Sequence, residues 1–427
     1  MTTPFLRRNT LRVLPHADIP NIRVNYLMTA AESAVFIGGN WIFFWQLFMT
    51  FGQLGLNDAL GFAFGLFMEI PTGALADIIG KRWTLRAAML INGIGFLVMG
   101  SATAASGLIV GFLMFQVGIA LYSGAAEALT YDSLKERKLE HDYDRVAAAS
   151  SSVSLVTLMA CILIGAWMYQ VDVRLPHWAW GVAFLLGFVA ALGLTEPKVG
   201  EPARFTVRGY FAQLATGARE LVKPHLRMFV PLMFGLTGVF FIYSWGIVQP
   251  AVAISFGFGP DEQAFISSGA YVVIAVIIRF LPFLRRRLGD VAGLTLVNLG
   301  LFGALLLMTA PLGAWGVLPL LLMHMAGSTS RTWLSVVINQ RTPSAIRATT
   351  LSTVALLTKI PYTLMAVVAG LMIEGGQLSV FLIGMAVSSV ALLGLSHVIR
   401  LRTSPAARAA PVFAATPEPE PVVEPAG

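Results

Sequence analysis

Seven ionisable side chains lie within long apolar stretches of the sequence. A charged group at the centre of a membrane-spanning helix costs about 3 kcal/mol or more, so such residues usually serve binding or ion transfer. Carboxylates in these surroundings are suited to taking up and releasing protons, and Glu32 and Glu127 are the predicted proton carriers. The seven residues are Glu32, Glu69, Glu127, Arg279, His324, Arg331 and Lys359.

The composition around these residues indicates a polytopic membrane protein. Of the 427 residues, 56% are hydrophobic and only 12% are charged, and the mean hydropathy is +0.75. A soluble protein carries about 25% charged residues. Each crossing requires about 20 apolar residues, so the length allows about twelve helices. The single cysteine, Cys161, precludes an intramolecular disulfide, and no cleavable signal peptide is evident.

No constellation for enzyme chemistry occurs. The six histidines and the cysteine are scattered without metal-ligand spacing, and the sequence lacks a G-x-x-x-x-G-K-(S/T) phosphate-binding loop. We therefore expect no enzyme, metal or cofactor. The net charge of +7 does not require a nucleic-acid partner, because the bases cluster in alternate loops.

The apolar segments predict an all-α membrane protein with twelve transmembrane helices. The first six are expected at residues 24–50, 58–77, 84–104, 107–132, 146–170 and 176–195. The second six are expected at residues 227–253, 264–284, 291–310, 313–338, 347–371 and 375–399. The predicted domains are an N-terminal six-helix bundle with a cytoplasmic N-terminal tail (1–195), a cytoplasmic central loop (196–226), a C-terminal six-helix bundle (227–402) and a disordered, Pro-rich cytoplasmic tail (403–427).

The charges in the loops predict the orientation. One set of loops is basic and holds Lys81, Arg82, Arg86, Lys135, Arg137, Lys138, Arg145, Arg285, Arg286, Arg287, Arg341 and Arg347. The opposite set is mostly acidic and holds Asp58, Asp172, Arg174, Asp261, Glu262 and Glu374. By the positive-inside rule, both termini and the central loop are cytoplasmic, in the cell (cytoplasmic) membrane. Within the central loop, residues 205–216 predict an amphipathic helix on the anionic inner leaflet.

A compact polar motif separates the second and third apolar segments. Residues 69–82 read E-I-P-T-G-A-L-A-D-I-I-G-K-R. A basic turn explains the bases at its end, but not the regular spacing of its glycines and acid. That spacing resembles the signature loop of the major facilitator superfamily, G-x-L-A-D-(R/K)-x-G-(R/K)-(R/K), from which Ile78 departs. The matching residues are Gly73, Leu75, Ala76, Asp77, Gly80, Lys81 and Arg82.

The resemblance covers Arg23 to Arg402 and implies the fold of that superfamily. This fold has two pseudo-symmetric six-helix bundles around a cavity lined by the first, fourth, seventh and tenth helices. It also implies that Lys81 pairs with Asp132, and that Asp77 lies near the start of the eleventh helix. The motif Y-D-S-L at 131–134 resembles a subgroup, also carrying E-I-P-T-G, whose members are largely of unknown substrate.

Polar side chains follow one face of the fourth helix and one face of the tenth helix, at about 100° per residue. Matching depth and opposite charge predict a gate ion pair between Glu127 and Arg331, and a second inter-bundle pair between Glu69 and Lys359. The predicted substrate-cavity residues are Asn40, Gln116, Ser123, Tyr131, His324 and Ser328.

Structural explanations stay open for several of these residues. Arg279 lies near a cytoplasmic helix end and can extend to the lipid headgroups. His324 fits a buried packing role, and Arg331 fits an ion pair within its own bundle. Glu69 fits a cap on the backbone break at Pro71.

These features predict a secondary active transporter that exports a small amphipathic organic molecule with proton coupling by alternating access. The predicted partners are the substrate, protons and the lipid bilayer, with no nucleic acid, and the protein is expected to be a monomer. The alternative is an importer of a small anionic metabolite, with Arg331, Lys359 and His324 as its anion site. It stays open because helix motifs typical of drug–proton antiporters are absent. A non-transporting scaffold or receptor is a third hypothesis, which the intramembrane charges disfavour.

Overall fold

The computed structural model describes residues 14–199 and 206–405, which contain helices and no β-strand. The first half contains α2 (Pro20–Glu32), α3 (Trp41–Trp45), α4 (Phe51–Ile79), α5 (Lys81–Gly100), α6 (Ala105–Lys135), α7 (Tyr143–Val171) and α8 (Leu175–Ala191). The helix α9 (Val207–Leu221) connects the halves. The second half contains α10 (Val230–Leu232), α11 (Val239–Trp245), α12 (Val248–Ser255), α13 (Pro260–Leu307), α14 (Val317–Arg341), α15 (Ser344–Glu374) and α16 (Leu378–Arg402).

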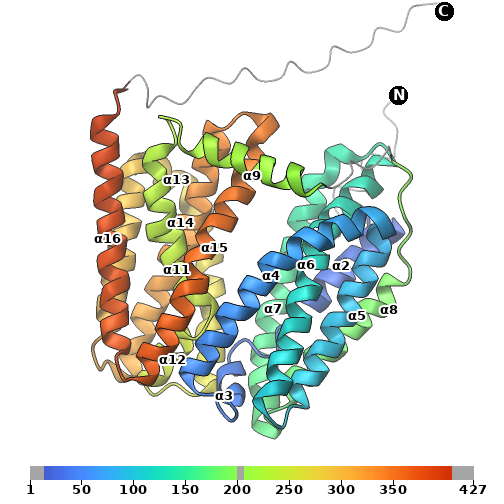
Figure 1. Cartoon of the computed structure of the whole chain (residues 1–427), viewed down its shortest axis with the longest axis horizontal. Coiled ribbons are helices and arrows are strands. Elements are labelled where there is room, and N and C mark those ends of the chain that lie inside the picture. Colours follow the sequence, from blue (N-terminus) through green and yellow to red (C-terminus); the bar gives the residue numbers. More distant parts are fainter. Residues whose placement is uncertain (1–13, 200–205, 406–427) are drawn as a thin grey trace, which may run out of the picture.

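These elements form twelve spans in two six-helix bundles, which confirms the predicted fold class (Figure 1). Within the described part of the chain, seven helices are long and apolar enough to cross a membrane. The first span consists of α2 and α3, and the seventh consists of α10 to α12 with a π-helical segment at Met233–Gly238. The eighth and ninth spans share α13, which bends at Gly289, where φ is +70°. Glycine adopts this backbone conformation without steric cost.

The first span is broken, although the sequence predicted a continuous helix. The backbone at residues 33–40 leaves α-helical geometry between α2 and α3. A Cβ atom at Gly39 would lie 2.7 Å from the Cα atom of Ala264 in α13, so only glycine permits this approach. The indole Nε1 of Trp180 donates a 3.2 Å hydrogen bond to the carbonyl of Glu32. Non-helical backbone is tolerated at membrane depth where the protein covers it in this way.

Aromatic side chains fill the interior of each bundle. In the first bundle, the ring of Phe96 lies 4.1 Å from that of Trp180 and 5.7 Å from that of Phe184, measured between centroids. In the second bundle, Trp333 and Tyr243 are fully buried. The buried side chains of both bundles form one continuous core, in which Phe62 of the first bundle packs against Phe241 of the second.

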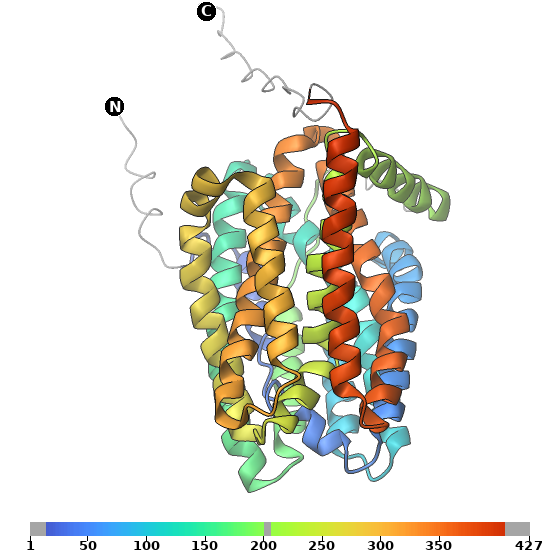
Figure 2. The ribbon, with the colours of Figure 1, turned by 90° about the vertical axis from the view of Figure 1, so that its left-hand side faces the viewer.

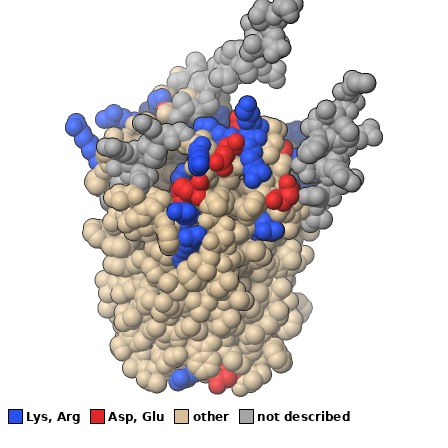
Figure 3. All heavy atoms as spheres, turned by 90° about the vertical axis from the view of Figure 1, so that its right-hand side faces the viewer, with Lys and Arg blue, Asp and Glu red and all other residues tan. Residues whose placement is uncertain are grey.

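Charged side chains gather at one end of the face shown in Figure 3, and few lie at the other end. We call this the basic end and the other the opposite end. The helix α9 lies at the basic end (Figure 1). The exposed bases of the connections at the basic end include Arg137, Lys138, Arg286 and Arg287.

The two bundles meet most extensively along α4 and α15, and next along α7 and α13. In Figure 1, α4 and α15 lie together at the opposite end and diverge toward the basic end. Side chains at the opposite end therefore determine how the bundles are held together.

Candidate functional site

An acidic side chain is buried where α4 of the first bundle meets α15 of the second. Asp58 is 7% exposed, and the hydroxyl of Tyr362 donates a 2.8 Å hydrogen bond to its Oδ2 atom. The ring of Phe62 packs against that of Tyr362 at 4.7 Å between centroids, and against Trp245 of α11 at 5.7 Å. The sequence placed Asp58 in an outer loop, which is wrong because α4 begins at Phe51.

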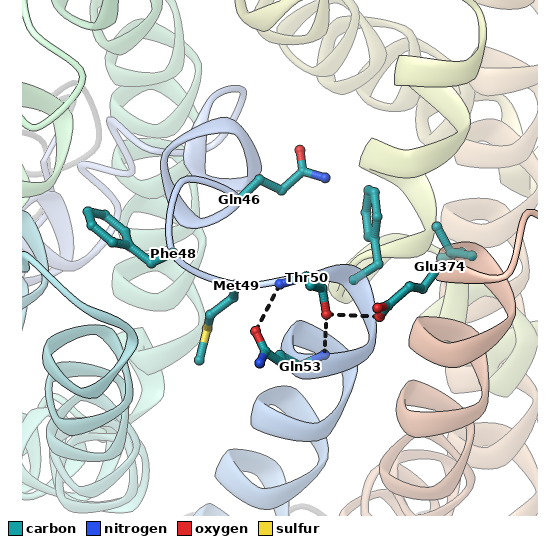
Figure 4. A pocket seen from close by; sticks show the side chains of 8 residues that line it. Gln46, Phe48, Met49, Thr50, Gln53 and Glu374 are labelled. Carbon is teal, nitrogen blue, oxygen red and sulfur yellow. Dashed lines mark hydrogen bonds between the residues drawn. The ribbon is translucent and has the colours of Figure 1, made fainter.

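A second carboxylate joins the bundles at the opposite end. Glu374, at the end of α15, accepts hydrogen bonds from Thr50 Oγ1 at 2.8 Å and from the Gly52 backbone N–H at 2.7 Å. Figure 4 shows this carboxylate pointing toward Thr50 across a pocket that Gln46 and Phe48 also line. Backbone N–H groups at a helix N-terminus lack intrahelical partners, and the helix dipole favours an anion there. A residue of the second bundle thus completes the cap of a helix in the first.

Glycines let α4 and α15 approach closely beside this cap. A Cβ atom at Gly55 would lie 2.3 Å from the carbonyl oxygen of Ala366 and 3.0 Å from the Cα atom of Gly370. Elsewhere at this end, Gln170 Nε2 of α7 donates a 2.8 Å hydrogen bond to Asp261 Oδ2 of α13. In the described ranges, the hydrogen bonds identified between the bundles all lie in the half nearest the opposite end. This conformation is therefore sealed at the opposite end.

We expect Tyr362→Phe to weaken the seal, because it removes the hydroxyl that donates to the buried Asp58 carboxylate. An unsatisfied buried polar group costs about 1–3 kcal/mol, which corresponds to about a tenfold or larger shift away from the sealed conformation. Spin labels at Leu47 and Gln377, which are both exposed at the opposite end, report the opening by double electron–electron resonance.

The matched control is Tyr243→Phe. The Tyr243 hydroxyl is buried and has no hydrogen-bond partner among the described residues, so its removal should leave the distances unchanged. Adding Asp58→Asn to Tyr362→Phe removes the buried charge and should restore part of the sealed population. Identical distance distributions in Tyr362→Phe and the parent protein would contradict the assigned role of this hydrogen bond.

At the basic end, Lys81 Nζ forms an ion pair with Asp132 Oδ2 of α6, as the resemblance implied. This pair lies within the first bundle and joins the start of α5 to α6. Gly73 and Asp77 lie in α4, but their surroundings are outside what the structure describes. The contact expected between Asp77 and the start of α15 therefore stays a prediction.

The turn between α4 and α5 is held by an acid that the sequence did not suggest. Gly80 ends α4 with φ at +89°, a value that favours glycine. The Glu196 carboxylate then accepts hydrogen bonds from the backbone N–H groups of Lys81 and Arg82, each at 3.0 Å. Glu196 follows the last helix of the first bundle, so it ties the end of that bundle to the signature loop.

The corresponding turn of the second bundle, at Gly289, is held by Asp290. Its Oδ1 atom accepts from Arg285 at 2.8 Å and from Trp333 Nε1 at 2.9 Å, and Arg341 lies 3.4 Å from Oδ2. Asp290 was not predicted as a functional residue, although it ends the run R-R-R-L-G-D at 285–290, in which an acid follows three arginines and a glycine.

Several predicted cavity residues are accessible in this conformation. On α6, Glu127, Ser123 and Tyr131 are exposed, and on α14 Arg331 is exposed. Over the described part of the chain, neither Glu127 nor Arg331 has a hydrogen-bond or ion-pair partner. The predicted gate pair is therefore not formed while the opposite end is sealed.

His324 lies between two aromatic rings of α11, 6.0 Å from that of Phe240 and 6.3 Å from that of Tyr243 between centroids. Its Nε2 atom is buried and has no partner among the described residues. Ser328, one turn further along α14, is half-buried. These residues keep a polar group available inside the second bundle, and their role toward substrate stays a prediction.

Asn40 and Gln116 are buried and hydrogen-bonded to backbone carbonyls in this conformation, and their role in a substrate cavity stays a prediction. Asn40 is fully buried, and its Nδ2 atom donates to the carbonyl of Gly165 at 3.1 Å. The Nε2 atom of Gln116 donates to the carbonyl of Gly61 at 2.8 Å. Both side chains connect helices of the first bundle.

Glu69 contacts α9 rather than Lys359. The hydroxyl of Tyr210 donates a hydrogen bond to the Glu69 carboxylate, and burial, together with this carboxylate, raises the pKa of the Tyr210 phenol. Lys359 is half-buried and forms no ion pair in the described ranges. The predicted Glu69–Lys359 pair is absent from this conformation.

Glu32, the other predicted proton carrier, accepts a 3.1 Å hydrogen bond from Ser33 Oγ.

The sequence from residue 24 to residue 360 matches the family model of the Major Facilitator Superfamily. The chain belongs to this family. Membership of this superfamily explains the two six-helix bundles. As a superfamily member it is a membrane transporter and not an enzyme.

Among superfamily relatives, multidrug resistance protein MdtH of Blochmanniella pennsylvanica (strain BPEN) is 22% identical over 199 residues. That match spans 46% of this chain and less than half, 44%, of the relative. The nucleoside transporter NupG matches with a TM-score of 0.69 and 14% identity, over 90% of this chain and 99% of NupG. A bacterial homologue of the lysosomal transporter Spinster, solved inward-facing and unoccupied, matches with a TM-score of 0.65 and 16% identity, over 90% and 98% of the two chains. These structures share the fold.

Proposed function

We propose that this superfamily transporter is a proton-coupled exporter of a small amphipathic organic molecule that works by alternating access in the cell membrane. The main support is the uneven joining of the bundles. Asp58, Glu374 and Gly55 seal the opposite end, whereas Glu127 and Arg331, in the other half, are exposed and have no partner among the described residues. A transporter that alternates its access requires such a seal at one end at a time.

The orientation follows from charge. Bases concentrate at the basic end (Figure 3), so by the positive-inside rule this end is cytoplasmic, together with both termini. This conformation is then inward-facing. The similarity of part of the chain to a multidrug resistance protein favours organic compounds as substrates.

The decisive experiment uses purified protein in proteoliposomes with a panel of labelled amphipathic compounds and an imposed proton gradient. We expect Glu32→Gln or Glu127→Gln to reduce gradient-driven transport about tenfold or more, because the amide cannot carry the proton. Substrate exchange without a gradient should continue. Glu140→Gln, an exposed loop acid at the basic end, is the control and should behave as the parent protein.

Normal gradient-driven transport in both Gln variants would overturn the role of these carriers. The importer hypothesis receives support from one observation, the buried unpartnered Nε2 atom of His324 near the exposed Arg331 on the same helix. If this alternative holds, anionic compounds rather than amphipathic ones are transported, and Arg331→Gln abolishes their binding.

A further inference from the structure

The helix α9 has one face packed on the protein. Gly217, Glu220 and Leu221 are buried, and a Cβ atom at Gly217 would lie 2.1 Å from Thr353 Oγ1 of α15. Near the other end of α9, Tyr210 reaches Glu69 of α4. The helix therefore lies across the seam between α4 and α15 and contacts both bundles.

A second face of α9 is apolar and uncovered. Val207 is 52% exposed, Phe211 is 54% exposed and Val222 is 67% exposed. At about 100° per residue these three side chains fall within about 60° of one another around the helix axis. They form a continuous stripe, which we call the α9 stripe. Covering an apolar surface of this kind removes it from water and so stabilises the protein.

Basic side chains border the α9 stripe on one side. Arg208 and Arg219 project about 40–60° beyond Val222 around the axis. Both carry positive charge, and neither forms an ion pair with any residue that the structure describes. Thr216, on the far side of these arginines, is exposed and polar. The order around the helix is thus apolar stripe, bases, then neutral polar surface.

The position of α9 is consistent with a helix whose apolar and basic sides face a membrane surface. Figure 2 shows α9 standing out from the body of the protein at the basic end, beside α15. There the transmembrane helices leave the bilayer, so a helix crossing them lies at the level of the lipid headgroups. A surface helix with apolar residues on one side and bases beside them matches the acyl boundary and the anionic headgroups, respectively.

We propose that α9 is an interfacial helix bound to anionic lipid. The α9 stripe enters the boundary between headgroups and acyl chains, and Arg208 and Arg219 bind lipid phosphates. This inference depends on the placement of α9 and not on the substrate or the direction of transport. Because α9 contacts both α4 and α15, lipid binding anchors the seam between the bundles to the membrane surface.

Depth-dependent fluorescence quenching tests the proposal on the full-length protein. In a Cys161→Ser background, a fluorophore is attached at Phe211→Cys and, as the matched control, at Thr216→Cys. The protein is reconstituted with lipids brominated on their acyl chains, in vesicles with phosphatidylglycerol or with phosphatidylcholine alone. We expect quenching at position 211 to exceed that at position 216 about twofold or more, and to be stronger in the phosphatidylglycerol vesicles.

A second variant separates the roles of charge and apolar contact. Arg208→Gln combined with Arg219→Gln should remove the difference between the two kinds of vesicle while the Phe211 label stays quenched, and raised salt should act in the same direction. Equal quenching at positions 211 and 216 would overturn the proposal. The same result is expected if a protein, and not lipid, covers the α9 stripe. Equal quenching at position 211 in both kinds of vesicle would also overturn it.

Discussion

Gly55→Leu is expected to prevent the opposite end from closing and to reduce transport about tenfold or more. The leucine Cβ atom would meet the backbone carbonyl of Ala366 at 2.3 Å, and backbone atoms of a packed helix have little room to move. Overpacking of this kind costs about 1–3 kcal/mol, which shifts a two-state equilibrium about tenfold or more. The variant folds, because the clash exists only while α4 and α15 are in contact.

Two measurements check this result. Transport is assayed in proteoliposomes, and spin labels at Arg137 and Arg287, exposed at the basic end on the two bundles, report the conformation. With the opposite end held open, the label distance should become shorter. Gly394→Leu is the matched control, because a Cβ atom there has no neighbour within 4 Å. Parent-like transport and distances in Gly55→Leu would show that closure does not require this contact.

A larger effect is expected from exchanging the charges of Glu127 and Arg331. Glu127 lies about 12 Å from the basic end of α6, and Arg331 about 15 Å from that of α14, at about 1.5 Å per residue. Their depths match and their charges are opposite, and in this conformation neither is paired with a residue that the structure describes. We predict that they form an ion pair when the bundles close at the basic end. A buried charge without its partner costs about 3–5 kcal/mol.

Glu127→Arg and Arg331→Glu should therefore each lower transport about a hundredfold, and the double variant should recover a substantial part of it. Disulfide crosslinking between cysteines at positions 127 and 331, in the Cys161→Ser background, should occur only in the conformation closed at the basic end. A double variant no more active than the single variants, with no crosslink in any condition, would disprove the gate pair.

The helical fold could be predicted because the length and hydropathy of apolar segments are properties of the sequence alone. The break at residues 33–40 could not, because it depends on a close approach to Ala264 in the other bundle. By contrast, the turn at Gly289 within α13 lies between the two helices expected at residues 264–284 and 291–310, so the sequence predicted it. The local sequence predicts where a helix tends to form, but it does not identify a distant residue whose contact interrupts the helix.

Some contacts of the candidate site could be predicted from the sequence, and others could not. The pair of Lys81 and Asp132 followed from a motif whose members are close in the fold. Asp58 and Glu374 were read as outer-loop acids, although their partners lie 304 and 322 residues away in sequence. Asn40 shows the reverse case, a polar residue in a predicted span whose Nδ2 atom bonds the backbone carbonyls of Phe36 and Gly165 in this conformation. Distant partners decide such roles, and no local pattern encodes them.

The broken first span has a consequence for how the protein is made. α2 and α3 leave the ribosome before α7 and α13, yet the break between α2 and α3 is supported by residues of those two later helices. The carbonyl that Asn40 bonds belongs to Gly165, 125 residues downstream, and Gly39 rests against α13. Unpaired backbone groups facing lipid are too costly to persist, so the newly inserted segment must first be a continuous helix. We therefore expect biogenesis to include a late unwinding step, after α7 and α13 have inserted and docked.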